Sequence, residues 1–486
     1  MCGYMPIIDV YAREILDSAG NPAIEVEIMT EDGTVGRAAV PSDVLGNGGG
    51  ASEICHLMNS ALADVVIGEN VYEQASIDLL FHRKSRYVGS LTRSGLRCVS
   101  MAVAVTAAKS LCLPLYRYLG GICAVRLPIP MVTLLYDVRY KEKPAGEITI
   151  LSDVQEIMIM PTGACTYEKG LRMCMEVCRV FWQMLAEQRG CAGDGASMPA
   201  GQEPGSAAER ACPGDGILPA GNSRSTANPT FVGNEILPES AGKSVTNRGS
   251  ADDPVSEGNR MNIEAVFSLI SEAVKKAGYQ PGREIALAID VAADALYEEA
   301  SGTYVFRCER KPDGDDIRRS TEKMPDNGEI RKSTEEMIDW LESLCHSFPI
   351  LSIVDGLSRN DREGWKKLTR RLGGRVRLVA DMLFDAAPKA FLDEHREQIA
   401  NAVLIRPDRF DTLTDLLHTA TMARGNGYEV VFSYGARETL DPMIADLAVA
   451  VGGTQFRGGA PCRAEAAAKY NRLLRIEDSL GLAAWK

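Results

Sequence analysis

Six polar residues in the second half of the sequence each end a short apolar run. The runs are EIALAID, ILSIVD, RVRLVAD, NAVLIR, YEVVFSY and GTQFR, and the residues that end them are Asp290, Asp355, Asp381, Arg406, Tyr434 and Arg457. Carboxylates can ligate a hard cation, and they can also form bidentate ion pairs with guanidinium groups. If the fold brings these residues together, they form a candidate site.

The spacing of these residues predicts how they are positioned. From Asp355 to Arg457 they follow one another at intervals of 26, 25, 28 and 23 residues, with helix-like stretches between the apolar runs. Each interval fits one βα unit, and a train of such units predicts a parallel barrel whose active site collects at the carboxyl ends of the strands. With 486 residues, the chain is long enough for a barrel and a further domain.

The composition excludes several classes of function. A net charge of −13 argues against a nucleic-acid surface. No apolar run reaches membrane-spanning length, and the first residues lack the pattern of a signal peptide, so we expect a cytoplasmic protein. The 13 cysteines are scattered and never form CxxC, and the five histidines are also scattered. Neither a disulfide framework nor a zinc site is predicted.

Two segments interrupt the rhythm. Residues 190–261 are rich in Gly, Ser, Ala, Pro and Asn and carry a degenerate repeat, with copies GDGASMPAG, GDGILPAGN and GNEILPESA. This composition predicts a disordered insertion. Residues 313–337 contain a tandem duplication, IRRSTEKM and IRKSTEEM, which we interpret as a loop expansion.

Several stretches resemble the enolase family. The N-terminal AREILDSAGNPAIEVEIMTEDGTVGRAAVPS is similar to the opening of enolases, and so are SMAVAVTAAKSLCLPLYRYLGG, VQEIMIMPTGA, FPILSIVDGL, GWKKLTRRLGGRVRLVADMLF, ETLDPMIADLAVA and GGAPCRAEAAAKYNRLLRIEDSLG. The resemblance covers nearly the whole chain apart from the two interruptions. It implies an α/β protein with an N-terminal α+β domain over residues 1–127 and an enolase-type (β/α)8 barrel over residues 128–486.

The resemblance also implies a chemistry, in which Mg²⁺ stabilises the carbanion of 2-phosphoglycerate while a lysine removes the proton. Asp290 and Asp381 match two of the three metal carboxylates of the family, but the third position is Val354, which cannot ligate a hard cation. Asp355 is one residue further along the strand and is expected to point to the opposite side. Met382 replaces a further acid of the family motif.

The positions of the base and the substrate-binding groups are also altered. Arg406 stands where the family has its proton-abstracting lysine, and Arg457 stands where a second lysine binds the substrate carboxylate. A guanidinium stays protonated and cannot act as a base. The phosphate-binding His, Arg and Ser become Tyr434, Gly435 and Ala436, although Arg437 lies close enough to offer a cation.

Other matches are mixed. Glu156 corresponds to an active-site acid of the family, and Leu45 replaces the serine of the first mobile loop. Glu235 is either the remaining active-site glutamate or part of the insertion repeat. Glu25 of the small domain's dimer surface is kept, whereas Ala19 replaces an arginine.

Three hypotheses follow. The first is an impaired or inactive enolase homologue retained as a binding or partner subunit with a small carboxylate or phosphate ligand. It would form a homodimer or pair with a genuine enolase. Asp290 and Asp381 are then ion-paired with Arg406 and Arg457, an arrangement that we favour over a magnesium site. The second is an active Mg²⁺-dependent carbon–oxygen lyase, the phosphopyruvate hydratase of glycolysis, with rearranged ligands. The third is a lyase or isomerase acting on another carboxylate.

Overall fold

The structure is a computed structural model, and it describes residues 3–42, 50–84, 93–136, 154–188, 263–307, 329–384, 399–435 and 437–481. All of them belong to one compact unit. The predicted insertion at 190–261 lies outside the described residues, as do Leu45, Glu235, Ala436 and the first copy of the duplication.

The first domain is an antiparallel sheet covered on one face by helices. Its strands are β1 (Ile7–Leu16), β2 (Pro22–Thr30) and β3 (Val35–Pro41), and its helices are α1 (Gly50–Leu57), α2 (Ala63–Val66), α3 (Gln74–Lys84), α4 (Arg93–Ser110) and α5 (Leu115–Gly120). Buried and partly exposed residues alternate along β2, as a sheet with one covered face requires. Helix α4 packs so closely on β3 that a Cβ at Gly36 would lie 2.4 Å from the backbone nitrogen of Thr106.

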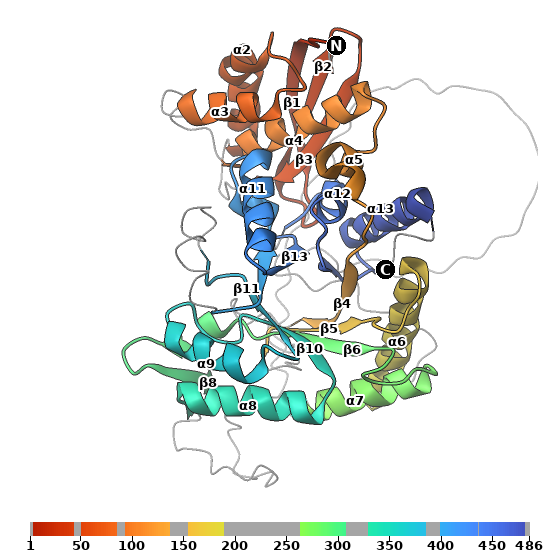
Figure 1. The fold of residues 1–486 in the computed structure, drawn as a ribbon, viewed down its shortest axis with the longest axis vertical. Helices are drawn as coiled ribbons and strands as arrows, with labels where there is room; N and C mark the ends of the chain where they lie inside the picture. Colours follow the sequence, from red (N-terminus) through yellow and green to blue (C-terminus); the bar gives the residue numbers. More distant parts are fainter. Residues whose placement is uncertain are drawn as a thin grey trace, which may run out of the picture. The chain divides into compact units, whose positions relative to one another are not determined.

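The second domain is a closed eight-stranded barrel, as predicted (Figure 1). Its strands, in order around the barrel, are β10 (Ile350–Val354), β11 (Arg377–Ala380), β12 (Ala402–Ile405), β13 (Glu429–Ser433), β14 (Gln455–Gly459), β4 (Ile129–Tyr136), β5 (Glu156–Met160) and β6 (Ala286–Asp290). The six apolar runs identified in the sequence form β6 and β10 to β14, and all of these run parallel. Within the barrel, β5 runs antiparallel to both of its neighbours, β4 and β6.

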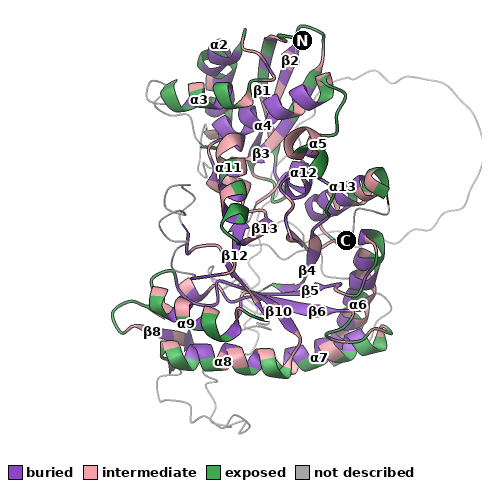
Figure 2. Ribbon diagram, viewed as in Figure 1, coloured by how far each residue is buried: buried purple, intermediate pink, exposed green. Residues whose placement is uncertain are grey.

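The barrel helices follow their strands in sequence. They are α6 (Tyr167–Gln188), α7 (Ile263–Lys276), α8 (Thr334–Ser347), α9 (Arg362–Leu372), α11 (Leu413–Gly425), α12 (Met443–Ala450) and α13 (Ala464–Leu480). Figure 2 shows barrel strands buried along their length, while α7 and α8 carry buried residues on one side and exposed residues on the other. The barrel interior holds a separate apolar cluster: Met131, Met158, Met160, Ala288, Val354, Val379, Ala402, Leu404 and Val431.

The second copy of the duplication is not a loop, contrary to the sequence interpretation. Residues 330–337 form most of β9 (Glu329–Lys332) and the first turn of α8, and β9 pairs with β8 (Thr303–Arg307), which also pairs with β7 (Tyr297–Glu298). The physical reason is local, because Ser333 and Glu336 form a reciprocal capping box and Met337 is buried. The sequence interpretation had not anticipated strand β9.

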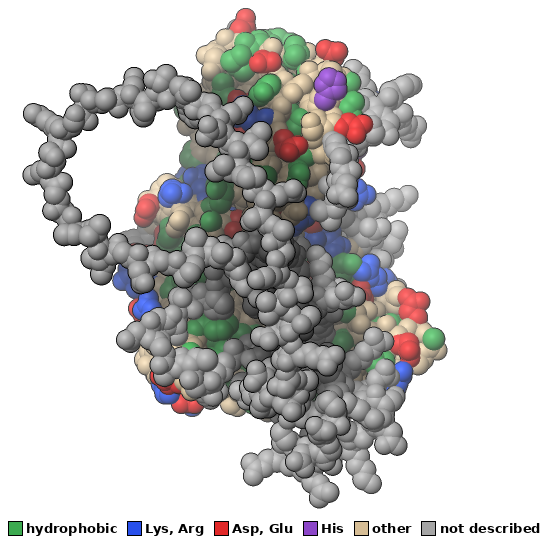
Figure 3. Space-filling model, turned by 180° about the vertical axis from the view of Figure 1, so that it is seen from behind, with side chains coloured by type: hydrophobic (Ala, Val, Ile, Leu, Met, Phe, Trp, Pro, Cys, Tyr) green, Lys and Arg blue, Asp and Glu red, His purple; other side chains and the backbone are tan. Residues whose placement is uncertain are grey.

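The surface of the described part carries both signs of charge. On the face shown in Figure 3, Lys and Arg side chains lie in several small groups separated by acidic and neutral ones. Among the described residues, no single helix is long and apolar enough to cross a membrane. One pair, Arg93–Ser110 with Leu115–Cys123, meets the length and composition test together but is bent by 97° at its break.

Candidate functional site

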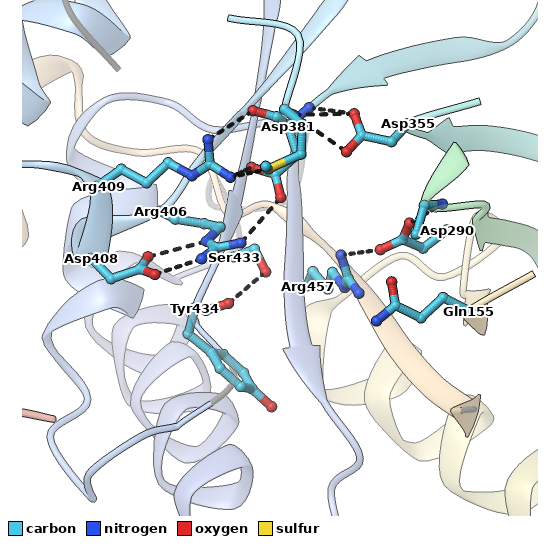
Figure 4. Close-up of polar contacts among 12 residues, drawn as sticks. Gln155, Asp290, Asp355, Asp381, Arg406, Asp408, Arg409, Ser433, Tyr434 and Arg457 are labelled. Carbon is cyan, nitrogen blue, oxygen red and sulfur yellow. Dashed lines mark hydrogen bonds and ion pairs between the residues drawn. The ribbon is translucent and has the colours of Figure 1, made fainter. Parts of the chain in front are cut away.

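The barrel brings the predicted acids to one end. Asp290 is the last residue of β6, and its Cα partner on β10 is Val354. Glu156 is the first residue of β5, and because β5 is antiparallel, that residue lies beside Asp290 at the same end of the barrel. Figure 4 shows Asp290, Asp355 and Asp381 at neighbouring strand ends, with Arg457 pointing toward Asp290 and Arg406 toward Asp381.

Arg457 bridges two buried carboxylates. Its Nη1 lies 2.8 Å from Oδ2 of Asp290, and its Nη2 donates a hydrogen bond to Oε2 of Glu156. All three side chains are almost wholly buried, with exposures of 15%, 8% and 4% for Arg457, Asp290 and Glu156. Burial raises the pKa of Asp290, and the nearby Arg457 opposes that rise. Burial also disfavours the guanidinium charge, but Glu156 and Asp290 outweigh it and raise the pKa of Arg457.

A second cluster surrounds Asp381. Nη1 of Arg406 donates to Oδ2 of Asp381 at 3.2 Å, while its Nε and Nη2 hold Asp408 at 3.1 Å and 2.5 Å. Arg409 approaches the other carboxylate oxygen of Asp381 at 3.0 Å and donates to its backbone carbonyl at 3.2 Å. Although burial opposes it, the two aspartates raise the pKa of Arg406. The predicted pairing of Asp290 and Asp381 with the two arginines is therefore confirmed.

Asp355 does not continue the regular strand. Asp355 has a left-handed backbone, with φ of 43°, which breaks the alternation of the strand. Its carboxylate consequently lies against the end of β11, where it accepts hydrogen bonds from the backbone N–H groups of Asp381 at 2.9 Å and Met382 at 3.3 Å. Burial, together with the negative charges of Asp381 and Asp290, raises the pKa of Asp355 well above its usual value. Asp355 is thus a strand-capping acid of the same cluster.

The region next to Asp408 holds an aromatic ring and a rearranged arginine. The hydroxyl of Tyr434 would lie 1.7 Å from a Cβ at Gly459, so only glycine fits beneath it. The ammonium group of the buried Lys469 lies 5.1 Å from the centre of the Tyr434 ring. Arg437 turns toward the small domain, where its Nη2 donates to the carbonyl of Ser42 at 2.7 Å.

Comparison with protein families identifies the fold. Residues 7–119 match the family described as enolase, N-terminal domain, and residues 234–485 match the family described as enolase, C-terminal TIM barrel domain. The second match alone spans more than half of the 486 residues. The chain belongs to the enolase family. The predicted resemblance and fold class are confirmed. The ion-paired clusters around Arg457 and Asp381 lie where barrel strands of this enolase-family chain end.

Magnesium, which enolases use, does not fit the groups present. Among the described residues, no three or more His, Cys, Asp or Glu side chains are arranged to hold a metal ion. Oδ2 of Asp290 is held by Arg457 and Oδ1 accepts from the backbone of Ala292 at 3.0 Å. Asp381 has an arginine at each carboxylate oxygen. At the third position, the side chain of Val354 is fully buried in the barrel interior, and it offers no oxygen.

Some residues of this enolase-family site escaped the sequence analysis. Arg409 and Asp408 complete the Asp381 cluster, and Thr133 of β4 donates a hydrogen bond to Glu156. The segment RPDR, directly after β12, holds three charged residues. This density of charge at a strand end was the signal in the sequence that could have identified Asp408 and Arg409. Thr133 gave none, because a threonine within an apolar strand is common.

Proposed function

We propose that this enolase-family protein does not dehydrate 2-phosphoglycerate at a useful rate and acts instead as a binding or partner subunit. The observation that carries this proposal is the bridging of Glu156 and Asp290 by Arg457. The groups that would meet a metal-bound carboxylate are neutralised by the protein's own side chain. A substrate would have to displace the buried ion pairs by which Arg457 bridges the two carboxylates before any chemistry began.

The position of the base supports the same proposal. Removal of a proton from the carbon next to a carboxylate requires a base that is unprotonated in the ground state. Arg406 is held in its charged form by Asp408 and Asp381. Loss of a positioned base lowers the rate about 10²–10⁴-fold. The third metal carboxylate, which Val354 replaces, would stabilise the same transition state. These losses are not additive, but each lowers the rate.

The first prediction is that the purified protein with excess Mg²⁺ forms no measurable phosphoenolpyruvate from 2-phosphoglycerate, followed by absorbance. A genuine enolase assayed in parallel is the positive control. Arg406→Lys should remain inactive, because the lysine would still lie between Asp381 and Asp408 and the metal ligands would still be incomplete. Turnover within tenfold of the ~10 s⁻¹ typical of enzymes would contradict the proposal and establish the active, rearranged enolase.

The partner role has its own surface, the face of the β1–β2–β3 sheet that no described helix covers. Arg13 lies 2.8 Å from Glu25 and 2.9 Å from Glu27, and Arg37 pairs with the same two glutamates. Beside this network of ion pairs, Tyr11 is half exposed, and the guanidinium carbon of Arg13 lies 5.1 Å from the centre of its ring. A surface that carries both positive and negative side chains can be complementary to itself, which suits a two-fold contact with a second copy of the chain.

We therefore expect a homodimer in solution, measured by light scattering after size-exclusion chromatography. Tyr11→Glu should give a monomer, because it places a charge in the centre of the contact. Leu440→Glu, at an exposed apolar residue outside the sheet, is the matched control and should leave the dimer intact. A monomeric parent protein that forms a mixed species only when a genuine enolase is added would replace the homodimer with the heterodimer.

A further inference from the structure

Three cysteine thiols lie on or beside two barrel helices that contact each other, α6 and α13. Cys174 and Cys178 are on α6, and Cys462 is in the turn directly before α13. The first two are fully buried, the third is exposed, and all three are free thiols. Among the described residues, no three or more His, Cys, Asp or Glu side chains are placed to hold a metal ion, so the thiols do not form a metal site there. The chemistry left to them is oxidation.

The two helices run in opposite directions. Strand β14 is parallel to β4, whereas β5 is antiparallel to it, and α6 and α13 follow β5 and β14 in sequence. The end of α13 caps the start of α6, because the carboxylate of Glu477 accepts hydrogen bonds from the backbone N–H groups of Tyr167 and Glu168, the second at 2.9 Å. Residues counted forward from the start of α6 therefore lie beside residues counted backward from the end of α13.

This antiparallel register can be checked halfway along the contact. Cys174 follows Tyr167 by seven residues and Tyr470 precedes Glu477 by seven, so each lies about 10 Å along its helix from the shared cap. The register thus places Cys174 beside Tyr470. Burial raises the pKa of Tyr470 well above its ordinary value, and Cys174 is among the neighbouring groups that add to the rise.

The same register brings Cys178 close to Cys462. Cys178 is about 16 Å along α6 from its start, and Ala464, the first residue of α13, is about 20 Å from Glu477. Cys462 lies two residues before Ala464. Burial raises the pKa of Cys178 to about 12, and the nearest contributor after burial is Cys462. One buried thiol and one exposed thiol therefore face each other across the two helices.

The two thiols belong to the two units that hold the Arg457 bridge. Glu156 is the first residue of β5, and the helix that follows β5 carries Cys178. Arg457 is in β14, five residues before Cys462, and it donates a hydrogen bond to Glu156. A covalent bond between the thiols would join the same two units as this buried ion pair.

We propose that Cys178 and Cys462 form a reversible disulfide that ties the β5–α6 unit to the β14–α13 unit. The exposed Cys462 thiolate first attacks one sulfur of a small disulfide such as oxidised glutathione, which releases one glutathione thiol. Cys178 then loses its proton and attacks Sγ of Cys462, which breaks the mixed disulfide and releases the second glutathione. Two protein thiols lose two electrons and two protons, and the small disulfide is reduced to two thiols. The inference does not depend on the absence of catalysis.

The test is incubation of the full-length protein with oxidised glutathione, followed by peptide mapping without reduction. Burial raises the pKa of both thiols, so a buffer of about pH 8.5 supplies more of the reactive thiolate. We expect the tryptic peptides 173–179 and 458–463 to be linked, and dithiothreitol to separate them. The melting temperature should rise by about 3 °C or more, because the bond closes a long loop in the unfolded chain.

Cysteine variants identify the two partners. Cys462→Ser should abolish both the linked peptides and the rise in melting temperature, and Cys178→Ser should do the same. If the buried Cys178→Ser fails to fold, the exposed Cys462→Ser still decides. Cys174→Ser should keep the link, which assigns it to Cys178 within their shared peptide. Cys123→Ser, at an exposed cysteine that follows α5, is the matched control and should behave as the parent protein.

Two results would overturn the inference. One is glutathione retained on Cys462 with no linked peptides, and the other is linked peptides that persist in Cys178→Ser. Since peptide mapping measures no turnover, either failure would leave the proposal on catalysis intact.

Discussion

Replacement of Arg457 with methionine is expected to lower the free energy of unfolding by about 3–5 kcal/mol at pH 8, the cost of removing one partner from a buried ion pair. Arg457 stands between Asp290 and Glu156, which are directly paired across β5 and β6 and are almost wholly buried. Without the guanidinium, two carboxylates face each other in a low-dielectric environment. Urea unfolding followed by circular dichroism measures the loss.

The stability of the Arg457→Met variant should depend on pH. Burial already raises the folded-state pKa of Asp290, and loss of Arg457 should raise it further. The folded variant then binds a proton at pH values where the unfolded chain has released it. Its stability therefore falls as pH rises from the unfolded pKa of about 3.9 through the raised folded value. The deficit relative to the parent protein should be smaller at pH 5 than at pH 8.

Two controls constrain that interpretation. Arg359→Met breaks a 2.5 Å pair with Asp294 in which the arginine is 43% exposed, and it should cost no more than about 1 kcal/mol. The triple variant Arg457→Met, Asp290→Asn, Glu156→Gln removes the charges altogether and should recover most of the lost stability. A deficit independent of pH and not relieved in the triple variant would show that Arg457 acts through packing alone.

Periodicity and residue chemistry predicted much of this arrangement from the sequence. Apolar runs ending in Asp290, Asp381, Arg406 and Arg457 identified the barrel strand ends, because a parallel barrel collects its strand termini on one face. The ion pairs followed from residue chemistry, since carboxylates beside buried arginines have no better partners. The strand ends needed only local sequence and the closure of the barrel, whereas the pairing of the acids with the arginines also rested on the resemblance to the enolase family.

What the sequence did not reveal depended on backbone conformation or on distant partners. The position of Asp355 depends on a left-handed φ that a non-glycine residue rarely adopts. No feature of EIMIM signalled the antiparallel direction of β5, which brings Glu156 beside Asp290. Arg97 of α4, in the other domain, donates to the carbonyl of Phe410 at 3.3 Å, and no local pattern connected it to the barrel.

The response to magnesium should be controlled by Val354. In the parent protein, ~10 mM Mg²⁺ is expected to shift the melting temperature by no more than about 1–2 °C, because Asp290 and Asp381 are occupied by arginines and the third position offers no oxygen. Val354→Glu should be destabilised by about 2–4 kcal/mol in a chelator, since it places a carboxylate in the apolar interior cluster beside Asp290. Added Mg²⁺ should then recover part of that loss.

How much stability Mg²⁺ restores to Val354→Glu depends on Arg457, whose guanidinium group competes with the metal for Asp290. Binding with a dissociation constant of 1 mM would return about 1.4 kcal/mol at 10 mM Mg²⁺ by mass action. Val354→Glu combined with Arg457→Met should show the larger Mg²⁺ dependence, because the metal no longer competes with Arg457 for Asp290. Arg406→Lys alone should behave like the parent protein, since it adds no ligand. A large, saturable Mg²⁺ stabilisation of the unmodified protein would mean that the arginine bridges yield to the metal, and a metal-dependent lyase would then be the better account of this barrel mouth.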